Sequence, residues 1–196
     1  MQCLPLQLSA QRVALETLTP AHLDEITTAA ADGELWKLFF TSVPAPQHCT
    51  QWLSNALTAM AEQRALPFAI RDLATGKIVG STRFFNLVRE HRRLEIGHTW
   101  LARSAQRSGI NTEMKLLMLR HAFQVWDCLA VEFRTDFFNH RSQAAIERLG
   151  AKRDGILRNH MVMPDGRIRD TVVYSILQNE WAGVEQNLQY LLDRRA

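Results

Sequence analysis

The segment from residue 94 to residue 126 restricts the possible folds more than any other part of the chain. Residues 94–101 are apolar or β-branched in loose alternation, which is typical of a β-strand. A basic loop containing Gly109 follows, and from Thr112 onward the residues are strong helix formers. The first turn of a helix has unpaired N–H groups and the positive end of the helix dipole, so this loop is suited to a phosphate. The segment predicts a strand, an anion-binding loop and a helix.

Similar patterns predict the other elements. Alternating segments predict strands at residues 12–18, 67–72, 77–85, 130–135, 153–160 and 170–177. Helical patterns predict helices at residues 20–30, 47–64, 112–126, 139–149 and 179–193, and residues 34–46 are expected to form an ordered apolar loop. This order predicts an α/β fold of the α+β type, with a mixed, mostly antiparallel central sheet and helices on both faces. We expect a single domain spanning residues 1–196.

The composition argues against several classes of protein. The net charge is only +3, and no cluster of Lys and Arg alternates with aromatic residues, so a nucleic-acid partner is not expected. No apolar run approaches the roughly 18 residues of a membrane span, and the N-terminus does not read as a signal peptide. The seven histidines show no HxH or HxxxH pairing, which argues against a metal site. Cys3, Cys49 and Cys128 are widely spaced, as expected of free thiols in a reducing cytoplasm.

The loop at Gly109 also resembles a known motif. Residues 106–111 are similar to the Gln/Arg-x-x-Gly-x-Gly/Ala loop of the GCN5-related N-acetyltransferase (GNAT) family, and the element order is that of the same family. Gln106 and Gly109 match the motif, whereas Asn111 departs from it. The resemblance implies the GNAT acyl-CoA N-acyltransferase fold and acetyl-coenzyme A (acetyl-CoA) as co-substrate. Its pyrophosphate ligands would be Gln106, Arg107, Ser108, Gly109, Ile110, Asn111 and Thr112, and Arg103, Arg107 and Arg148 are candidates for the ribose 3′-phosphate.

Two further blocks resemble the RimJ/RimL-type branch of this family. They are residues 95–101, and the pair formed by residues 139–142 and 147–151. The resemblance implies transfer of an acetyl group to a primary amine, with a protein N-terminal α-amine as the acceptor of this branch. It also implies that backbone amides near Trp100 and Leu101 hold the pantetheine arm and face the thioester carbonyl. Asn139 is expected both to cap its helix and to face the pantetheine.

Glu95 is our candidate for the general base, and the alternative is a strand-edge or ion-paired carboxylate. His98 is a second candidate, although strict strand alternation turns its side chain away from the face of Glu95. Most family members have a tyrosine as the acid, but this chain has Ile146 there. In the RimL-like branch a matching serine is thought to take this role, so Ser142 is assigned as acid or thiolate hydrogen-bond donor. Its alternative role is in the capped first turn of the helix.

Three questions stay open at this point. The acceptor is alternatively a small-molecule amine such as an amino acid, a polyamine or an antibiotic. The loss of the tyrosine raises a third reading, a coenzyme A-binding sensor with little turnover. Acceptor contacts are expected at Asn159, His160, Arg169 and Asp170, and a homodimer is suggested by the apparently exposed aromatic residues at 36–40 and 83–85.

Overall fold

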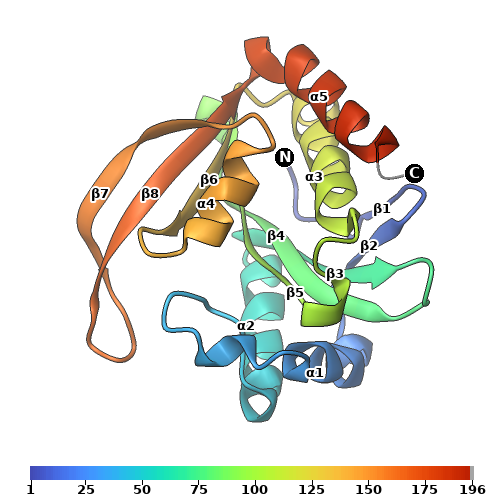
Figure 1. Ribbon diagram of the computed structural model, residues 1–196, viewed down its shortest axis with the longest axis vertical. Coiled ribbons are helices and arrows are strands. Elements are labelled where there is room, and N and C mark those ends of the chain that lie inside the picture. Colours follow the sequence, from blue (N-terminus) through green and yellow to red (C-terminus); the bar gives the residue numbers. More distant parts are fainter. Residues whose placement is uncertain (195–196) are drawn as a thin grey trace.

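The computed structural model describes residues 1–194, and its centre is one eight-stranded sheet (Figure 1). The strand order is β1-β2-β3-β4-β5-β6-β8-β7. The strands are β1 Gln7–Ser9, β2 Val13–Thr17, β3 Ala65–Asp72, β4 Ile78–Val88, β5 Arg93–Leu101, β6 Ala130–Asp136, β7 Lys152–Val162 and β8 Ile168–Leu177. Neighbouring strands are antiparallel except β5 and β6, which are parallel. The predicted mixed, mostly antiparallel sheet is confirmed, and β1 is a strand that the prediction missed.

Helices cover both faces of the sheet, as predicted. They are α1 Leu23–Ala31, α2 Cys49–Ala61, α3 Ile110–Arg120, α4 His140–Glu147 and α5 Trp181–Asp193. Adjacent residues of a strand point to opposite faces. On β4, Thr82 contacts Met118 of α3, whereas Arg83 lies over the Trp52 ring of α2. Helices α2 and α3 therefore lie on opposite faces, and α5 packs beside α3 (Figure 1).

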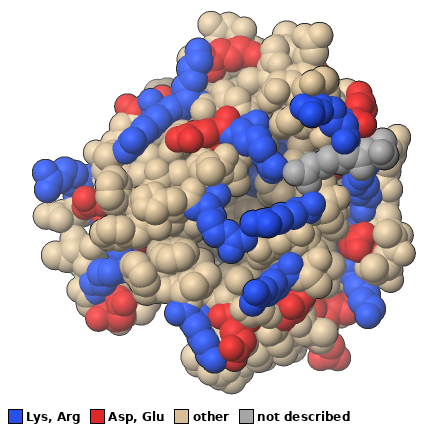
Figure 2. Space-filling model, in the orientation of Figure 1, with Lys and Arg blue, Asp and Glu red and all other residues tan. Residues whose placement is uncertain are grey.

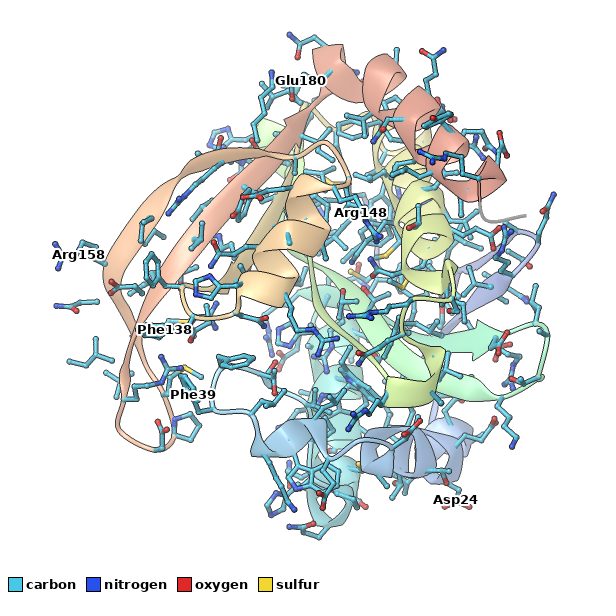
Figure 3. The ribbon with its side chains drawn as sticks, in the orientation of Figure 1. Asp24, Phe39, Phe138, Arg148, Arg158 and Glu180 are labelled. Carbon is cyan, nitrogen blue, oxygen red and sulfur yellow. The ribbon has the colours of Figure 1, made fainter. Side chains whose placement is uncertain are left out.

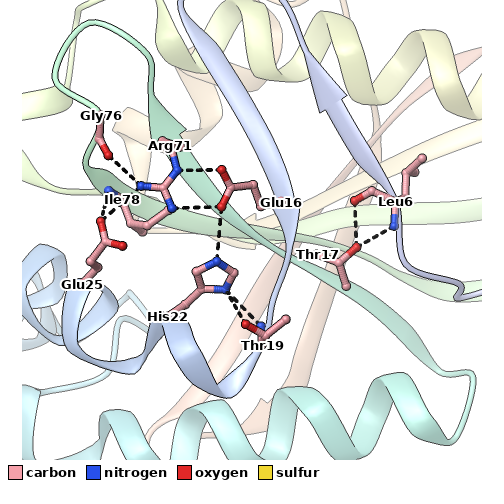
Figure 4. Close-up of polar contacts among 9 residues, drawn as sticks. All are labelled: Leu6, Glu16, Thr17, Thr19, His22, Glu25, Arg71, Gly76 and Ile78. Atoms are coloured by element: carbon pink, nitrogen blue, oxygen red, sulfur yellow. Dashed lines mark hydrogen bonds and ion pairs between the residues drawn. The ribbon is translucent and has the colours of Figure 1, made fainter.

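A polar cluster fixes α1 against the sheet (Figure 4). The Arg71 guanidinium on β3 donates to Glu16 of β2 over 2.6 Å and contacts Glu25 of α1 at 3.3 Å. Glu25 also accepts the Ile78 backbone N–H at 3.0 Å, and His22 lies 3.2 Å from Glu16. These contacts join α1 to strands β2, β3 and β4 and so fix the position of the helix on this part of the sheet.

Strands β5 and β6 separate after a short shared stretch. Their pairing runs only from Arg93↔Ala130 to Glu95↔Glu132. Beyond that point β5 continues to Leu101 paired with β4, and β6 continues to Asp136 paired with β8. The facing edges of the two strands are consequently unpaired from residues 96 and 133 onward. We call this opening the splay.

Three details of the fold differ from the predictions. The predicted helix at 112–126 is α-helical only to Arg120 and continues as a π-helical turn, His121–Val125. Arg83 and Phe84 are buried in the central strand β4, which contradicts the expected exposure of residues 83–85. The loop at residues 34–46 contains a short 3-10 helix, Leu35–Lys37, whereas the exposure of Phe39 agrees with the prediction.

Several absences hold for residues 1–194. No helix in this part of the chain is long and apolar enough to cross a membrane. The same residues contain no group of three or more His, Cys, Asp or Glu side chains placed to hold a metal ion. Cys3, Cys49 and Cys128 are buried free thiols.

Candidate active site

The predicted anion loop lies at the N-terminus of α3. Gly109 occupies the N-cap position with φ +92°, a left-handed conformation that favours glycine. The first helical bond runs from the Glu113 N–H to the Gly109 carbonyl, so the N–H groups of residues 110–112 have no partner within the helix. The loop is internally braced, because the Ser108 hydroxyl donates to the Ala105 carbonyl at 2.6 Å. Three successive N–H groups at a helix N-terminus form an anion-binding arrangement.

Arginines surround the loop. Arg103, Arg107, Gln106 and Arg141 line a cavity of about 590 Å³, and Figure 2 shows basic side chains gathered around a hollow on this face. Arg141 of α4 donates to Gln106 Oε1 at 2.8 Å, and Gln106 in turn donates to the Leu101 carbonyl at 3.1 Å. Arg141 was missed by sequence reasoning, although it belongs to the block at residues 139–142. The structure brings Arg103, Arg107 and Gln106 together as the loop pattern implied.

Arg148 lies away from this cavity. It occupies the C-cap of α4 and is exposed on the side of the helix near α3 (Figure 3). Asn139, at the opposite end of α4, is the N-cap residue, and its Oδ1 accepts the Ser142 backbone N–H at 3.1 Å. The capping interpretation of Asn139 is thus confirmed. The Ser142 hydroxyl has no hydrogen-bond partner among residues 1–194, and Ile146 is buried.

Glu95 lies on the opposite face of the sheet, the face covered by α2, in a second cavity of about 630 Å³. The residue is 4% exposed. Asn86 Nδ2 donates to its carboxylate at 2.9 Å, and Arg134 Nε lies 3.5 Å away. Burial raises the pKa of Glu95 to about 7, against the opposing effects of Asn86 and Arg134. A carboxylate with a pKa near 7 is suited to accept a proton at neutral pH.

His98 lies in the same cavity as Glu95, which corrects the prediction from strand alternation. The β4–β5 register changes between Ser81↔Trp100 and Arg83↔Gly97, so β5 contains a bulge, and His98 has a φ of +49°. An extra residue in a bulge reverses the alternation, and this puts His98 and Glu95 on one face. The His98 ring packs 4.9 Å from Phe85 and keeps contact with solvent. Desolvation by the surrounding protein, with the charges of Arg83 and Arg169, lowers its pKa to about 4.

Trp100 and Leu101 are buried on β5, beyond its last pair with β6. They therefore lie along the splay, between the anion loop and the bulge. Of the expected acceptor contacts, Arg169 is close enough for its charge to lower the pKa of both Glu95 and His98, although it does not line the cavity.

The other predicted acceptor contacts have partners within the last hairpin. The carboxylate of Asp170 accepts the Asn159 backbone N–H at 2.7 Å, and His160 lies 3.0 Å from the Thr171 hydroxyl. These contacts hold the strands β7 and β8 together where their register shifts. The side chains of Asp170 and His160 therefore stabilise the hairpin.

Known proteins resemble the chain over most of its length. The acetyltransferase (GNAT) domain matches residues 12–152. YdaF from Bacillus subtilis (strain 168), named as a putative ribosomal N-acetyltransferase, is 31% identical over 111 residues, which are 57% of this chain and 60% of YdaF. The match thus spans less than two thirds of that relative.

Two solved structures have the same fold. A GCN5-related N-acetyltransferase from Brucella melitensis has a TM-score of 0.87 at 29% identity, over 96% of this chain and 86% of its own. Mycobacterium smegmatis RimJ, solved in complex with CoA-disulfide, has a TM-score of 0.82 at 20% identity, over 97% of this chain and 96% of its own. Because the domain match covers most of the chain and the fold agrees, the chain belongs to the GNAT family of acetyltransferases.

Proposed function

We propose that the protein transfers the acetyl group of acetyl-CoA to a primary amine. The proposed acceptor is the N-terminal α-amine of a protein, as in the RimJ/RimL-type branch of the family. The observation that carries this proposal is the position and the raised pKa of Glu95. It is a buried carboxylate with a pKa near 7, at the residue where β5 and β6 begin to separate. Membership of the GNAT family and the similarity to YdaF support the reaction type and the acceptor class.

The residues of the loop and the splay fit acetyl-CoA. The free N–H groups of residues 110–112 and the arginines around Gln106 suit its phosphates. The unpaired edge of β5 at Trp100 and Leu101 suits the amide groups of the pantetheine arm, because an extended chain pairs with an open strand edge. RimJ of M. smegmatis, a protein of the same fold, was solved with a coenzyme A disulfide.

The chemistry follows from the acidity of the acceptor. An α-amine has a pKa near 7.7–8.0 and a lysine near 10.4, so at pH 7 about one α-amine in ten is neutral, against fewer than about one lysine in a thousand. Glu95 takes the proton that the amine loses. The nitrogen then bonds to the thioester carbon, and the carbon–sulfur bond breaks. The backbone N–H of Leu101, on the edge of β5 that faces the splay, stabilises the carbonyl oxygen, and Ser142 donates a hydrogen bond to the leaving thiolate.

The test is a thiol-release assay with acetyl-CoA against peptides of defined N-terminus and a panel of small amines. Glu95→Gln keeps the shape of the side chain but removes the base, and we expect kcat to fall by about 100-fold or more. Ser142→Ala is expected to have a smaller effect. The control is Glu90→Gln on the exposed turn before β5, which we expect to leave turnover unchanged.

Each result leads to a different conclusion. Turnover on peptides that is lost in Glu95→Gln supports the proposal and the role of this carboxylate. Turnover on small amines alone retains the enzyme and rejects the N-terminal acceptor. Coenzyme A binding without turnover on any amine rejects the enzyme and favours a sensor.

A further inference from the structure

The cavity that contains Glu95 also contains a buried arginine without an anionic partner. Arg83 lies in the middle of β4 and is 7% exposed. Among residues 1–194 its guanidinium makes no hydrogen bond or ion pair, and its Nε is buried without an acceptor. The guanidinium lies over the Trp52 ring, 5.1 Å from its centre. A buried cation is costly unless it is paired, so the cavity beside Arg83 is suited to an anion.

The neighbouring acids are already paired. Glu132 forms ion pairs with Arg93 and Arg134, and Arg134 also lies close to Glu95. The pKa of Glu95 near 7 leaves this carboxylate partly neutral at neutral pH. Five arginines and three glutamates line the cavity, so its net charge is positive. Arg83 is the buried arginine among them, and it is unpaired within residues 1–194.

Two further observations point to a missing acceptor on the same face. The Trp100 indole packs against Trp52 at 6.1 Å, and its Nε1 is a buried donor without a partner. Arg167 and Arg169 both form ion pairs with the single carboxylate of Asp136, and each keeps at least one buried N–H group without a hydrogen bond.

Arg83 lies close to Glu95, the residue at which the acceptor amine is proposed to bind. Phe85 pairs with Glu95 and Arg83 pairs with Gly97, so Glu95 and Arg83 are diagonal neighbours on one face of the sheet. Diagonal neighbours of this kind have Cα atoms roughly 7–8 Å apart. An amine held at Glu95 would therefore place its nearest substituent within reach of the Arg83 guanidinium.

We propose that Arg83 forms a carboxylate subsite of the acceptor cavity, so that the preferred acceptor is an amine with a carboxylate close to it. The carboxylate belongs either to an acidic side chain at the second residue of a peptide or to a free amino acid. Polyamines, which carry only positive charge, are poor acceptors. This inference rests on the proposed acetyl transfer and narrows its substrate class.

The experiment uses matched pairs of acceptors on the full chain. One series compares C-terminally amidated peptides that have Glu or Gln as the second residue. The other series compares alanine with alaninamide, at equal concentrations of neutral amine. We expect wild type to prefer the acidic member of at least one series by about tenfold or more in kcat/KM, and the series that shows the preference identifies the source of the carboxylate.

Arg83→Met removes the charge and keeps the length of the side chain. We expect it to reduce the preference to less than about threefold while turnover of the neutral acceptors persists. The control is Arg92→Met, which removes one positive charge from outside the cavity, where the exposed Arg92 is paired with Asp127. Its preference should equal that of wild type. The midpoint of thermal unfolding should be unchanged or higher in Arg83→Met, because the variant removes an unpaired buried cation.

The outcomes separate this inference from the proposed function. Equal turnover of acidic and neutral acceptors by wild type overturns the subsite and leaves acetyl transfer intact, whatever the variant does. If no amine is turned over, calorimetry with the N-acetylated forms of the same compounds decides. Tighter binding of the acid than of the amide, lost in Arg83→Met, supports the subsite although acetyl transfer fails. Equal binding overturns it.

Discussion

At the scale of single residues, burial changes the acid–base behaviour of a lysine behind the candidate site. Lys115 of α3 is 5% exposed, and its Nζ donates to the Thr99 hydroxyl at 2.8 Å and lies 5.7 Å from the centre of the Phe133 ring. Desolvation lowers its pKa to about 7. In the unfolded chain a lysine has a pKa near 10.4. Between these two pH values the unfolded state binds more protons, so this residue makes the free energy of unfolding rise with pH.

Replacing Lys115 with Met removes this contribution. We expect Lys115→Met to be more stable than wild type at pH 7, by on the order of a few kcal/mol, because a buried charge is replaced by an apolar chain of similar length. The difference should shrink as the pH rises from 7 to 10. Denaturant unfolding of both proteins at several pH values measures it, and a difference that stays constant with pH would contradict the lowered pKa. The control is Lys37→Met, since Lys37 is exposed.

At the scale of elements, the conformation of Gly109 joins the loop to α3. Its φ of +92° disfavours any side chain, so Gly109→Ala should cost about 1 kcal/mol of stability and disturb the N–H groups that follow it. Gly76 in the β3–β4 turn also has a positive φ, +70°, and a Cβ there would touch nothing. Both alanine variants should lose similar stability by denaturant unfolding. Only Gly109→Ala should lose coenzyme A affinity by calorimetry, and equal affinity in both would remove the loop from the binding site.

The same scale shows what local patterns predict and what they miss. The loop at Gly109, the cap at Asn139 and the strand that carries Glu95 were predicted because each depends on neighbours within a few residues. The bulge that turns His98 toward Glu95 depends on the register between β4 and β5, which no single strand encodes. The contact of Arg141 with Gln106 joins residues 35 positions apart, and it exists only once α4 has packed on the sheet. Long-range register and packing are therefore the parts that the sequence left open.

At the scale of the whole molecule, the sheet consists of two halves that share a short seam. Strands β1–β5 form one half and β6, β8 and β7 form the other, and three residue pairs between β5 and β6 join them. If acetyl-CoA lies along the splay, its binding links the halves. Coenzyme A at about 100 times its Kd should add about 2.7 kcal/mol to the free energy of unfolding. For a chain of this size that is roughly 5–10 °C in the midpoint of thermal unfolding.

Hydrogen exchange distinguishes binding along the splay from binding at the loop alone. Amides that exchange only by global unfolding should all slow by the amount that the added stability implies. Amides of residues 96–101 lie on a strand with one unpaired edge and can exchange by local opening, so coenzyme A should slow them by more than this common amount. Strand β3, which is buried and paired on both sides, provides the reference. Extra slowing confined to residues 106–112 would place the phosphates at the loop and the pantetheine arm outside the splay. In that case the thioester would not lie near Glu95, which would contradict the proposed role of Glu95 as the base.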